Sequence, residues 1–148
     1  MRKTILYLLL LALIAGAAYY FVFYKPDGAF PKSEADFGVK DTAAIGKLFL
    51  STPAGENILL ERSDSGWVLN KKYKALQSTI DIVMEVLHKQ EAKYPAPEAA
   101  HNNIIKSLAG DGVKVEVYNR AGDKIKVFYV GGEAHESSGS YMLLEGAP

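Results

Sequence analysis

The 148-residue chain contains no cysteine, and this absence excludes several kinds of chemistry. Without a thiol there is no disulfide scaffold, no thiolate zinc site, no cysteine nucleophile and no lipid-modified lipoprotein cysteine. An excess of charge is also absent, because 17 Lys and Arg residues balance 17 Asp and Glu residues. Nucleic-acid-binding domains normally carry a basic excess, so we do not expect nucleic acid as a partner.

The chain also lacks an Asn-X-Ser/Thr glycosylation sequon, since none of its asparagines has a hydroxyl residue two positions later. Together with the missing cysteines, this favours a bacterial envelope over a eukaryotic secretory route. Charged residues make up 23% of the chain and its six prolines are scattered. This composition excludes a wholly disordered chain and a collagen.

One long hydrophobic run is present. Residues 4–24 include no charge, proline or side-chain amide. As a helix, these residues would be roughly 32 Å long, which matches the hydrocarbon core of a bilayer. Arg2 and Lys3 make the N-terminal flank positive, which places it in the cytoplasm. We therefore expect residues 1–24 to form a cytoplasmic N-terminus and a single-pass transmembrane anchor in a bacterial inner membrane, with the bilayer contacting residues 4–24.

Two other interpretations of this run stay open. The small residues Ala15, Gly16 and Ala17 resemble a signal-peptidase site, so the run could be a cleaved signal peptide. The hydrophobicity continues through residues 21–23, beyond that site, and this favours an uncleaved anchor. A helix buried in a soluble protein is the third interpretation.

The remaining residues divide into a stalk and a domain. Residues 25–36 contain Pro26, Gly28 and Pro31, a turn composition that predicts a short stalk. Residues 37–148 then form an extracytoplasmic domain, which we expect in the periplasm. The part of the chain after the anchor carries 15 Lys and Arg against 17 Asp and Glu, a formal charge of −2.

Apolar and polar residues alternate in the first part of the domain, which predicts an antiparallel β-meander. Strands are expected at residues 37–39, 45–51, 58–61 and 67–70, with Leu48 and Leu50 pointing inward. Residues 41–42, 53–57 and 63–66 have the composition of turns.

From residue 76 onward, apolar residues are spaced three or four positions apart, as in an amphipathic helix. Leu76, Ile80, Val83 and Leu87 are spaced so that they share one helical face, with Met84 beside them. A second helix is expected over residues 98–109, after a proline-containing stop. We expect its inward face to consist of Ala100, Ile104, Ile105 and Leu108. Gly110 is expected to end the helix as a left-handed C-terminal cap.

Strands at residues 113–117, 124–130 and 141–144 close the chain, with Ile125, Val127 and Tyr129 on one face. The order of elements predicts an α+β protein: an N-terminal transmembrane helix followed by an antiparallel sheet with two packed helices (β-meander, α, α, β-meander).

The domain contains several distinctive short segments, in chain order Phe37-Gly38-Val39-Lys40-Asp41-Thr42, Ile45-Gly46-Lys47-Leu48-Phe49-Leu50, Gly66-Trp67-Val68-Leu69-Asn70, Tyr94-Pro95-Ala96-Pro97, Ala100-His101-Asn102-Asn103, Gly112-Val113-Lys114-Val115-Glu116-Val117-Tyr118 and Tyr129-Val130-Gly131-Gly132 ahead of Tyr141. In these motifs, across residues 37–148, the chain resembles an uncharacterised bacterial membrane-anchored envelope family, a domain of unknown function. The resemblance implies a fold and a location more than a chemistry.

Members of that family are often anchored by a single pass, and some relatives are auxiliary components of gliding-motility-type ABC transport systems. They continue well past the point that corresponds to residues 145–148. The resemblance therefore implies that this chain is a fragment or a short paralogue, whose last strand lies at an open sheet edge.

The sequence predicts no catalytic, cofactor-binding or metal-binding constellation. His88 and His101 are 13 residues apart, without the spacing of a metal motif. His135 stands beside an acid and two serines, but adjacent loop residues are not preorganised and no nucleophile elbow accompanies them.

Residues 71–74 are the densest basic segment of the chain. They could contact an acidic glycan, a lipid headgroup or a protein, but a solvated turn before a helix is the favoured interpretation. For Trp67, a core or sheet-packing position is favoured over a stacking platform. The candidate contact residues are Trp67, Lys71, Lys72, Tyr73, Tyr94, His135, Tyr141 and Leu143.

These observations predict a membrane-anchored protein that acts by protein–protein contact, as an accessory subunit of a larger envelope or ABC-transporter-associated complex. Its partner would be an envelope protein, and its contact surfaces would be the terminal sheet edge and the loop at residues 131–140. The alternative is a binding module for a cell-wall glycan or a small exported ligand, which a cleft lined by Trp67, Tyr73 and Tyr94 would favour. An enzyme is the least favoured class.

Overall fold

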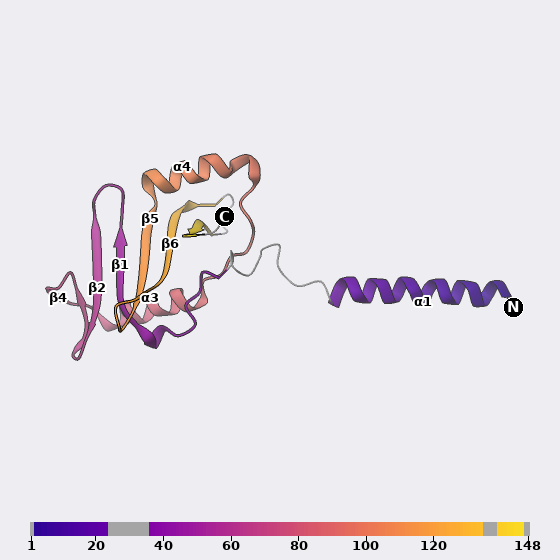
Figure 1. Ribbon diagram of the computed structural model, residues 1–148, viewed down its shortest axis with the longest axis horizontal. Helices are drawn as coiled ribbons and strands as arrows, with labels where there is room; N and C mark the ends of the chain where they lie inside the picture. The colour runs from indigo at the N-terminus through magenta and orange to yellow at the C-terminus, as the bar shows by residue number, and fades with distance from the viewer. Residues whose placement is uncertain (1, 24–35, 135–138, 147–148) are drawn as a thin grey trace.

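The computed structural model describes residues 2–23, 36–134 and 139–146. It confirms the α+β class: the domain is built on one seven-stranded antiparallel sheet with strand order β4-β3-β2-β1-β5-β6-β7 (Figure 1). The elements in chain order are α1 (Arg2–Phe23), η1 (Thr42–Ala44), β1 (Ile45–Ser51), β2 (Asn57–Ser63), β3 (Gly66–Leu69), β4 (Tyr73–Lys74), α3 (Gln77–Lys89), η2 (Glu98–Ala100), α4 (His101–Asp111), β5 (Val113–Asn119), β6 (Lys124–Glu133) and β7 (Ser140–Leu144).

The N-terminal helix α1 lies apart from the sheet (Figure 1). Tyr7, Leu11 and Leu13 are among its exposed side chains. Within the described part of the chain, no helix meets both the length and the hydropathy needed to cross a bilayer. The predicted stalk at residues 25–36 lies outside the described residues, except for Asp36.

The first meander matches the prediction closely, because alternating apolar residues and turn residues define each hairpin. Strand β1 has the predicted bounds, and β2 follows the loop at residues 52–56. The sequence did not predict β4, a two-residue strand that pairs with the end of β3 through Leu69 and Tyr73.

The predicted strand at residues 37–39 is wrong. These residues form no strand and bond to the end of α3 instead. The Val39 N–H donates to the Leu87 carbonyl at 2.8 Å, and the Gln90 side chain donates to the Phe37 carbonyl at 2.6 Å. Phe37 and Val39 are buried, so their apolar alternation indicated burial correctly. The turn expected after them is the 3₁₀ helix η1, which the Asp41 carboxylate caps.

Helix α3 covers one face of the sheet, as its apolar spacing predicts. Ile80 and Leu87 are buried in the main core, with Val83 and Met84 packed against it. Leu76 is not part of this face, because it precedes the helix and is 70% exposed. The core side chains from the sheet and the segment before it are Phe37, Val39, Ile45, Leu48, Trp67, Val115, Val117 and Phe128, with Leu50 half-buried against them.

Helix α4 is present, but its end and its inward face differ from the prediction. Gly110 lies inside the helix, which continues to Asp111 and ends at Gly112 with an ordinary φ of −71°. A Cβ atom on Gly112 would lie 2.3 Å from the Leu108 carbonyl oxygen, so only glycine allows the chain to turn directly into β5. Leu108 is buried against Gly131 of β6, whereas Ile105 is exposed.

The last three strands are longer than predicted. Strand β6 continues to Glu133, and β7 begins at Ser140. Cross-strand partners place Lys47 opposite Tyr118 and Phe49 opposite Glu116. Since neighbours along a strand point to opposite faces, these four residues lie on the face opposite Leu48 and Val117, away from α3.

Candidate functional site

The edge formed by β7 is the first candidate site. Among the described residues β7 pairs only with β6, so its outer side has no strand partner. The Glu145 N–H donates to the Val127 carbonyl at 3.0 Å, and hydrogen-bonded pairs alternate along an antiparallel ladder. The backbone of Leu143 therefore faces Tyr129 of β6, whereas the backbone groups of Met142 and Leu144 face outward.

The side chains of β7 do not protect this edge. Proteins usually protect an edge strand with lysine, proline, a bulge or extreme shortness. Strand β7 has five residues, Ser-Tyr-Met-Leu-Leu, with neither charge nor proline. Tyr141 and Leu143, two predicted contact residues, are half-buried in it. The pairing of β6 with β7 is irregular between Val130 and Glu133, so the regular part of this open edge is Met142 to Leu144.

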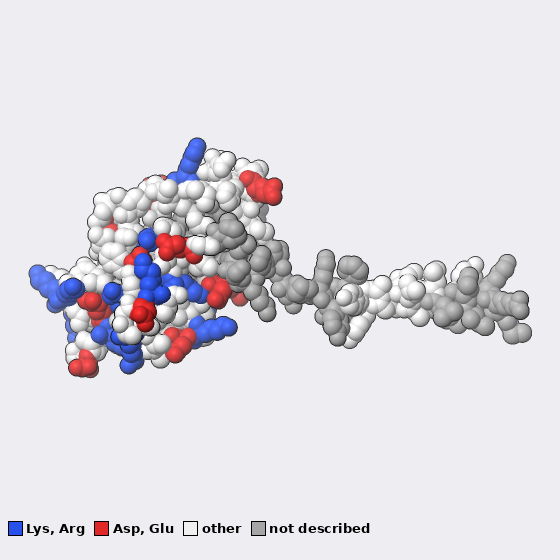
Figure 2. All heavy atoms as spheres, viewed as in Figure 1, with Lys and Arg blue, Asp and Glu red and all other residues white. Residues whose placement is uncertain are grey.

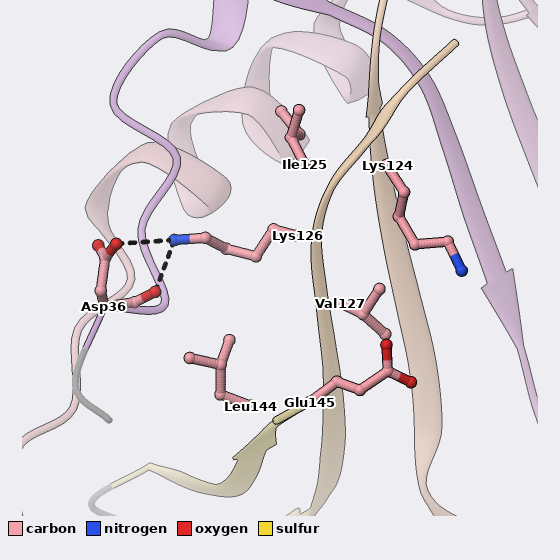
Figure 3. A pocket seen from close by; sticks show the side chains of 7 residues that line it. All are labelled: Asp36, Lys124, Ile125, Lys126, Val127, Leu144 and Glu145. Carbon is pink, nitrogen blue, oxygen red and sulfur yellow. Dashed lines mark hydrogen bonds and ion pairs between the residues drawn. The ribbon is translucent and has the colours of Figure 1, made fainter. Parts of the chain in front are cut away.

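An open groove of about 510 Å³ lies beside this edge (Figure 3). The last paired residues of β6 and β7 are Phe128 and Leu144, and Glu145 still bonds to Val127 just beyond them, so residues 124–126 of β6 have no strand partner on this side among the described residues. The groove occupies this step in the sheet. Its lining residues are Asp36, Lys124, Ile125, Lys126, Val127, Leu144 and Glu145.

One lysine fixes the wall of the groove opposite β7. The Lys126 ammonium donates to the Asp36 carbonyl at 2.5 Å and to the Gly38 carbonyl at 2.7 Å, and its nitrogen lies 3.4 Å from the Asp36 carboxylate. Figure 3 shows Lys126 reaching across to Asp36, with Leu144 and Glu145 on the β7 side. The segment before η1 is thereby held against β6.

A buried carboxylate on the face away from α3 is the site that the sequence analysis missed. Glu116 is 9% exposed. It accepts a hydrogen bond from the Tyr118 hydroxyl at 2.5 Å and from the Lys124 ammonium at 3.1 Å, and the Lys114 nitrogen lies 3.0 Å away. The Lys47 ammonium lies 3.9 Å from the centroid of the Tyr118 ring.

The surroundings of Glu116 favour its charged form. The Tyr118 hydrogen bond, with those of Lys114 and Lys124, lowers the pKa of Glu116 to about 2, although burial acts in the opposite direction. The same contacts raise the pKa of both lysines and of the Tyr118 hydroxyl. A carboxylate that stays ionised and fully partnered holds β5 to β6; it is not poised to exchange protons near neutral pH.

A signal for this cluster was present in the sequence. Lys114, Glu116 and Tyr118 alternate on β5, so they must share one face of that strand. Lys124 could not be assigned to the cluster in advance, because its position depends on the β5–β6 register, which shifts between Val117 and Tyr118.

The opposite end of the sheet carries the predicted basic segment. The Lys72 N–H donates to the Leu69 carbonyl at 3.0 Å across a turn in which Asn70 and Lys71 have φ values of 49° and 58°. Positive φ at both central residues is the geometry of a type I′ turn, which asparagine tolerates and lysine rarely adopts. The Asn70 side chain fixes the turn by accepting the Leu59 N–H at 2.8 Å.

The predicted aromatic contact residues do not form one cleft. Trp67 is 4% exposed and lies in the core beneath the Arg62 guanidinium, at 4.9 Å from the ring centroid. Tyr73 and Tyr94 are 57% and 80% exposed, and none of the three aromatic residues lines the groove beside β7. His135 lies outside the described residues.

A second cavity of about 420 Å³ lies where β1, β2 and the β5–β6 turn meet. The Nε atoms of Arg62 and Arg120 donate to the carbonyls of Ile45 and Ala43, at 3.0 and 3.2 Å, so both arginines support η1 and the start of β1. Glu61 and Asp64 share the cavity with these basic residues. Its mixed charge selects neither an anion nor a cation.

The histidines within the described part of the chain have local contacts. The His88 Nδ1 atom lies 3.3 Å from the Val39 carbonyl oxygen, and His101 begins α4. Among the described residues, no group of three or more His, Cys, Asp or Glu side chains is arranged to hold a metal ion.

In comparisons with known proteins, the chain matches no family model, no curated protein and no solved structure.

Proposed function

We propose that this protein is a membrane-anchored envelope domain that binds a partner protein by strand pairing at β7, as an accessory subunit of a larger envelope or ABC-transporter-associated complex. The observation that carries the proposal is that β7 is an uncharged five-residue edge strand, paired with β6 on one side and without a strand partner on its outer side among the described residues. Strand addition uses this kind of edge, because backbone hydrogen bonds supply the affinity.

The groove beside β7 supports this mode of binding. Val127 is buried while Ile125 is exposed on the uncovered part of β6. A strand that extended along β7 could therefore continue past its end towards residues 124–126 and place its side chains in the groove. Asp36, Lys124, Lys126 and Glu145 at its rim would select a partner segment of mixed charge.

The anchor is proposed from the sequence and from the exposure of α1. Residues 4–24 are uncharged and follow two basic residues, and described apolar side chains of α1 are exposed. A bilayer would cover these side chains, with the N-terminus in the cytoplasm of a bacterial inner membrane and the domain in the periplasm. Tethering would raise the effective concentration of the domain near a membrane-bound partner.

The resemblance to the uncharacterised envelope family is part of the same proposal. It rests on motifs that the structure places at structural positions, such as the buried Trp67 and the Gly131 that contacts Leu108. These positions fit a shared fold and give no indication of a reaction.

Affinity purification of the full chain from native membranes tests the strand-pairing proposal. Met142→Pro removes a backbone N–H that faces outward, and Met142→Ala shortens the same side chain but keeps that N–H. We expect the co-purifying protein to be recovered with the wild type and with Met142→Ala, and to be lost with Met142→Pro. Recovery of the same protein with all three chains would contradict strand pairing.

Leu143→Pro is the structural control for that experiment. It removes an N–H that faces β6, so we expect it to lower the free energy of unfolding more than Met142→Pro does, by about 1–3 kcal/mol. The anchor is tested separately by alkaline carbonate extraction of membranes. Release of the chain into the wash would overturn the anchor without affecting the strand-pairing result.

A further inference from the structure

The β4 end of the sheet carries a surface that strand pairing at β7 does not explain. We define the basic patch as Lys71, Lys72, Tyr73, Lys74 and Leu76. All five residues are exposed, and the apolar members are 57% exposed at Tyr73 and 70% at Leu76. The patch therefore combines positive charge with an aromatic and an aliphatic side chain at one protruding end of the fold.

The charge of the basic patch is not neutralised within the described part of the chain. No acidic residue occurs between Asp64 and Asp81, and no described carboxylate forms an ion pair with Lys71, Lys72 or Lys74. By contrast, Lys114 and Lys124 both contact Glu116. Figure 2 shows blue side chains projecting from the end of the molecule where Figure 1 labels β4.

The basic patch is held in place by its turn. Asn70 and Lys71 adopt positive φ, and backbone hydrogen bonds join Asn70 and Ala75 to Leu59 and Trp67 at 2.7 and 2.8 Å. The ammonium of Lys72 lies 5.1 Å from the centroid of the Tyr73 ring. The turn thus presents these side chains outward without first having to become ordered.

The shape of the basic patch distinguishes a bilayer from a sugar chain. A glycan site needs a concave surface in which polar groups and aromatic faces converge on the ligand. The basic patch lines neither the groove beside β7 nor the second cavity. A bilayer surface needs no concavity, since lysines reach anionic headgroups while tyrosine and leucine side chains enter the interface.

We propose that the basic patch docks the domain on the surface of an anionic bilayer, with its lysines at the phosphates and with Tyr73 and Leu76 in the interfacial region. Each lysine near an anionic surface strengthens binding by about fivefold. Three lysines together would thus give on the order of a hundredfold preference for anionic over neutral vesicles. The proposal depends neither on the anchor nor on strand pairing.

The absence of cysteine from the chain allows a direct test. Leu76→Cys creates a unique attachment site for an environment-sensitive fluorophore, and Ile125→Cys places the same label at an exposed position beside the other edge. The full-length chains are mixed with vesicles of phosphatidylcholine alone or with added phosphatidylglycerol. We expect a blue shift for the Leu76 label only with phosphatidylglycerol, and no change between vesicles for the Ile125 label.

Two variants separate this proposal from the others. The first is a triple variant that combines Lys71→Glu, Lys72→Glu and Lys74→Glu, and it should abolish the blue shift of the Leu76 label. The second, Met142→Pro, should leave that blue shift unchanged. Circular dichroism checks that each variant is folded. An equal emission of the Leu76 label in both vesicles would overturn the proposal. An equal blue shift with a soluble acidic polysaccharide would also overturn it, by showing that the basic patch recognises an acidic polymer and not a bilayer.

Discussion

The two edges of the sheet are built in opposite ways. Strand β4 has two residues, and lysines precede it and end it. Strand β7 has five residues, none of them charged. Shortness and lysine prevent a foreign strand from pairing, whereas a longer uncharged edge permits it. One sheet thus offers a backbone surface at β7 and a charged surface at β4.

The edges also differ in how firmly they are joined to the core. The neighbouring strands are both anchored in the core, β6 by Phe128 and β3 by Trp67, but Met142 and Leu144 of β7 itself also pack against the main core. Beside β3, Tyr73 of β4 points into solvent. Strand β7 is therefore supported by core packing of its own side chains, while β4 is held by its turn.

The largest expected effect comes from removing the core support of β7. Phe128→Ala deletes a buried ring, so we expect the free energy of unfolding to fall by about 3–5 kcal/mol in urea titrations. Tyr73→Ala at the other edge should change it by less than about 0.5 kcal/mol, because that ring is exposed. Similar losses for both variants would show that Tyr73 of β4 contributes to the core as much as the ring beside β7 does.

A smaller effect is expected from the carboxylate that joins β5 to β6. Glu116→Gln should lower the free energy of unfolding at neutral pH by about 1.5 kcal/mol, the lower end for charge-assisted hydrogen bonds, because its lysine partners are partly exposed. The pKa of Glu116 is about 2 in the folded chain, below its ordinary value of 4.5. Its contribution is therefore present above pH 4.5 and is lost as the pH falls towards 2.

Urea titrations at several pH values measure this linkage. The wild type should lose stability between pH 4.5 and 2 more steeply than Glu116→Gln does. Glu85→Gln is the matched control, because Glu85 forms an ion pair with Lys89 at 2.6 Å on the exposed side of α3. The same pH slope in the wild type and in Glu116→Gln would show that Glu116 is not a stabilising carboxylate.

Much of this fold follows from local sequence patterns. The spacing of Ile80 and Leu87 predicts α3 and its buried face, and alternation predicts β1 and β5, because both signals depend on residues near one another in the chain. The errors occur where distant residues decide the structure. The segment at Phe37 is held by Gln90, and α4 ends at Gly112 because of a close approach to Leu108.

The candidate sites were predictable to different degrees. The lysines of residues 71–74 are evident in the sequence, and turn residues such as Asn70 indicate that they protrude. The groove beside β7 was not predictable, because it exists only where the β6–β7 register stops at Phe128 and Leu144. Register is set by packing and by turn geometry across the whole sheet, which composition does not reveal.

The smallest effect on stability is expected when β4 is made uncharged, as β7 is. This change also tests most directly whether lysines are what distinguishes the two edges. Lys72→Val combined with Lys74→Val removes two exposed charges, so the free energy of unfolding should change by less than about 0.5 kcal/mol. The edge would then lack its protecting lysines, and we expect concentration-dependent self-association in sedimentation velocity. Lys72→Arg combined with Lys74→Arg keeps the charge and should sediment as the wild type does. If the valine variant also behaved as the wild type, the shortness of β4 alone would be sufficient to block pairing, and its lysines would serve only the bilayer contact proposed above.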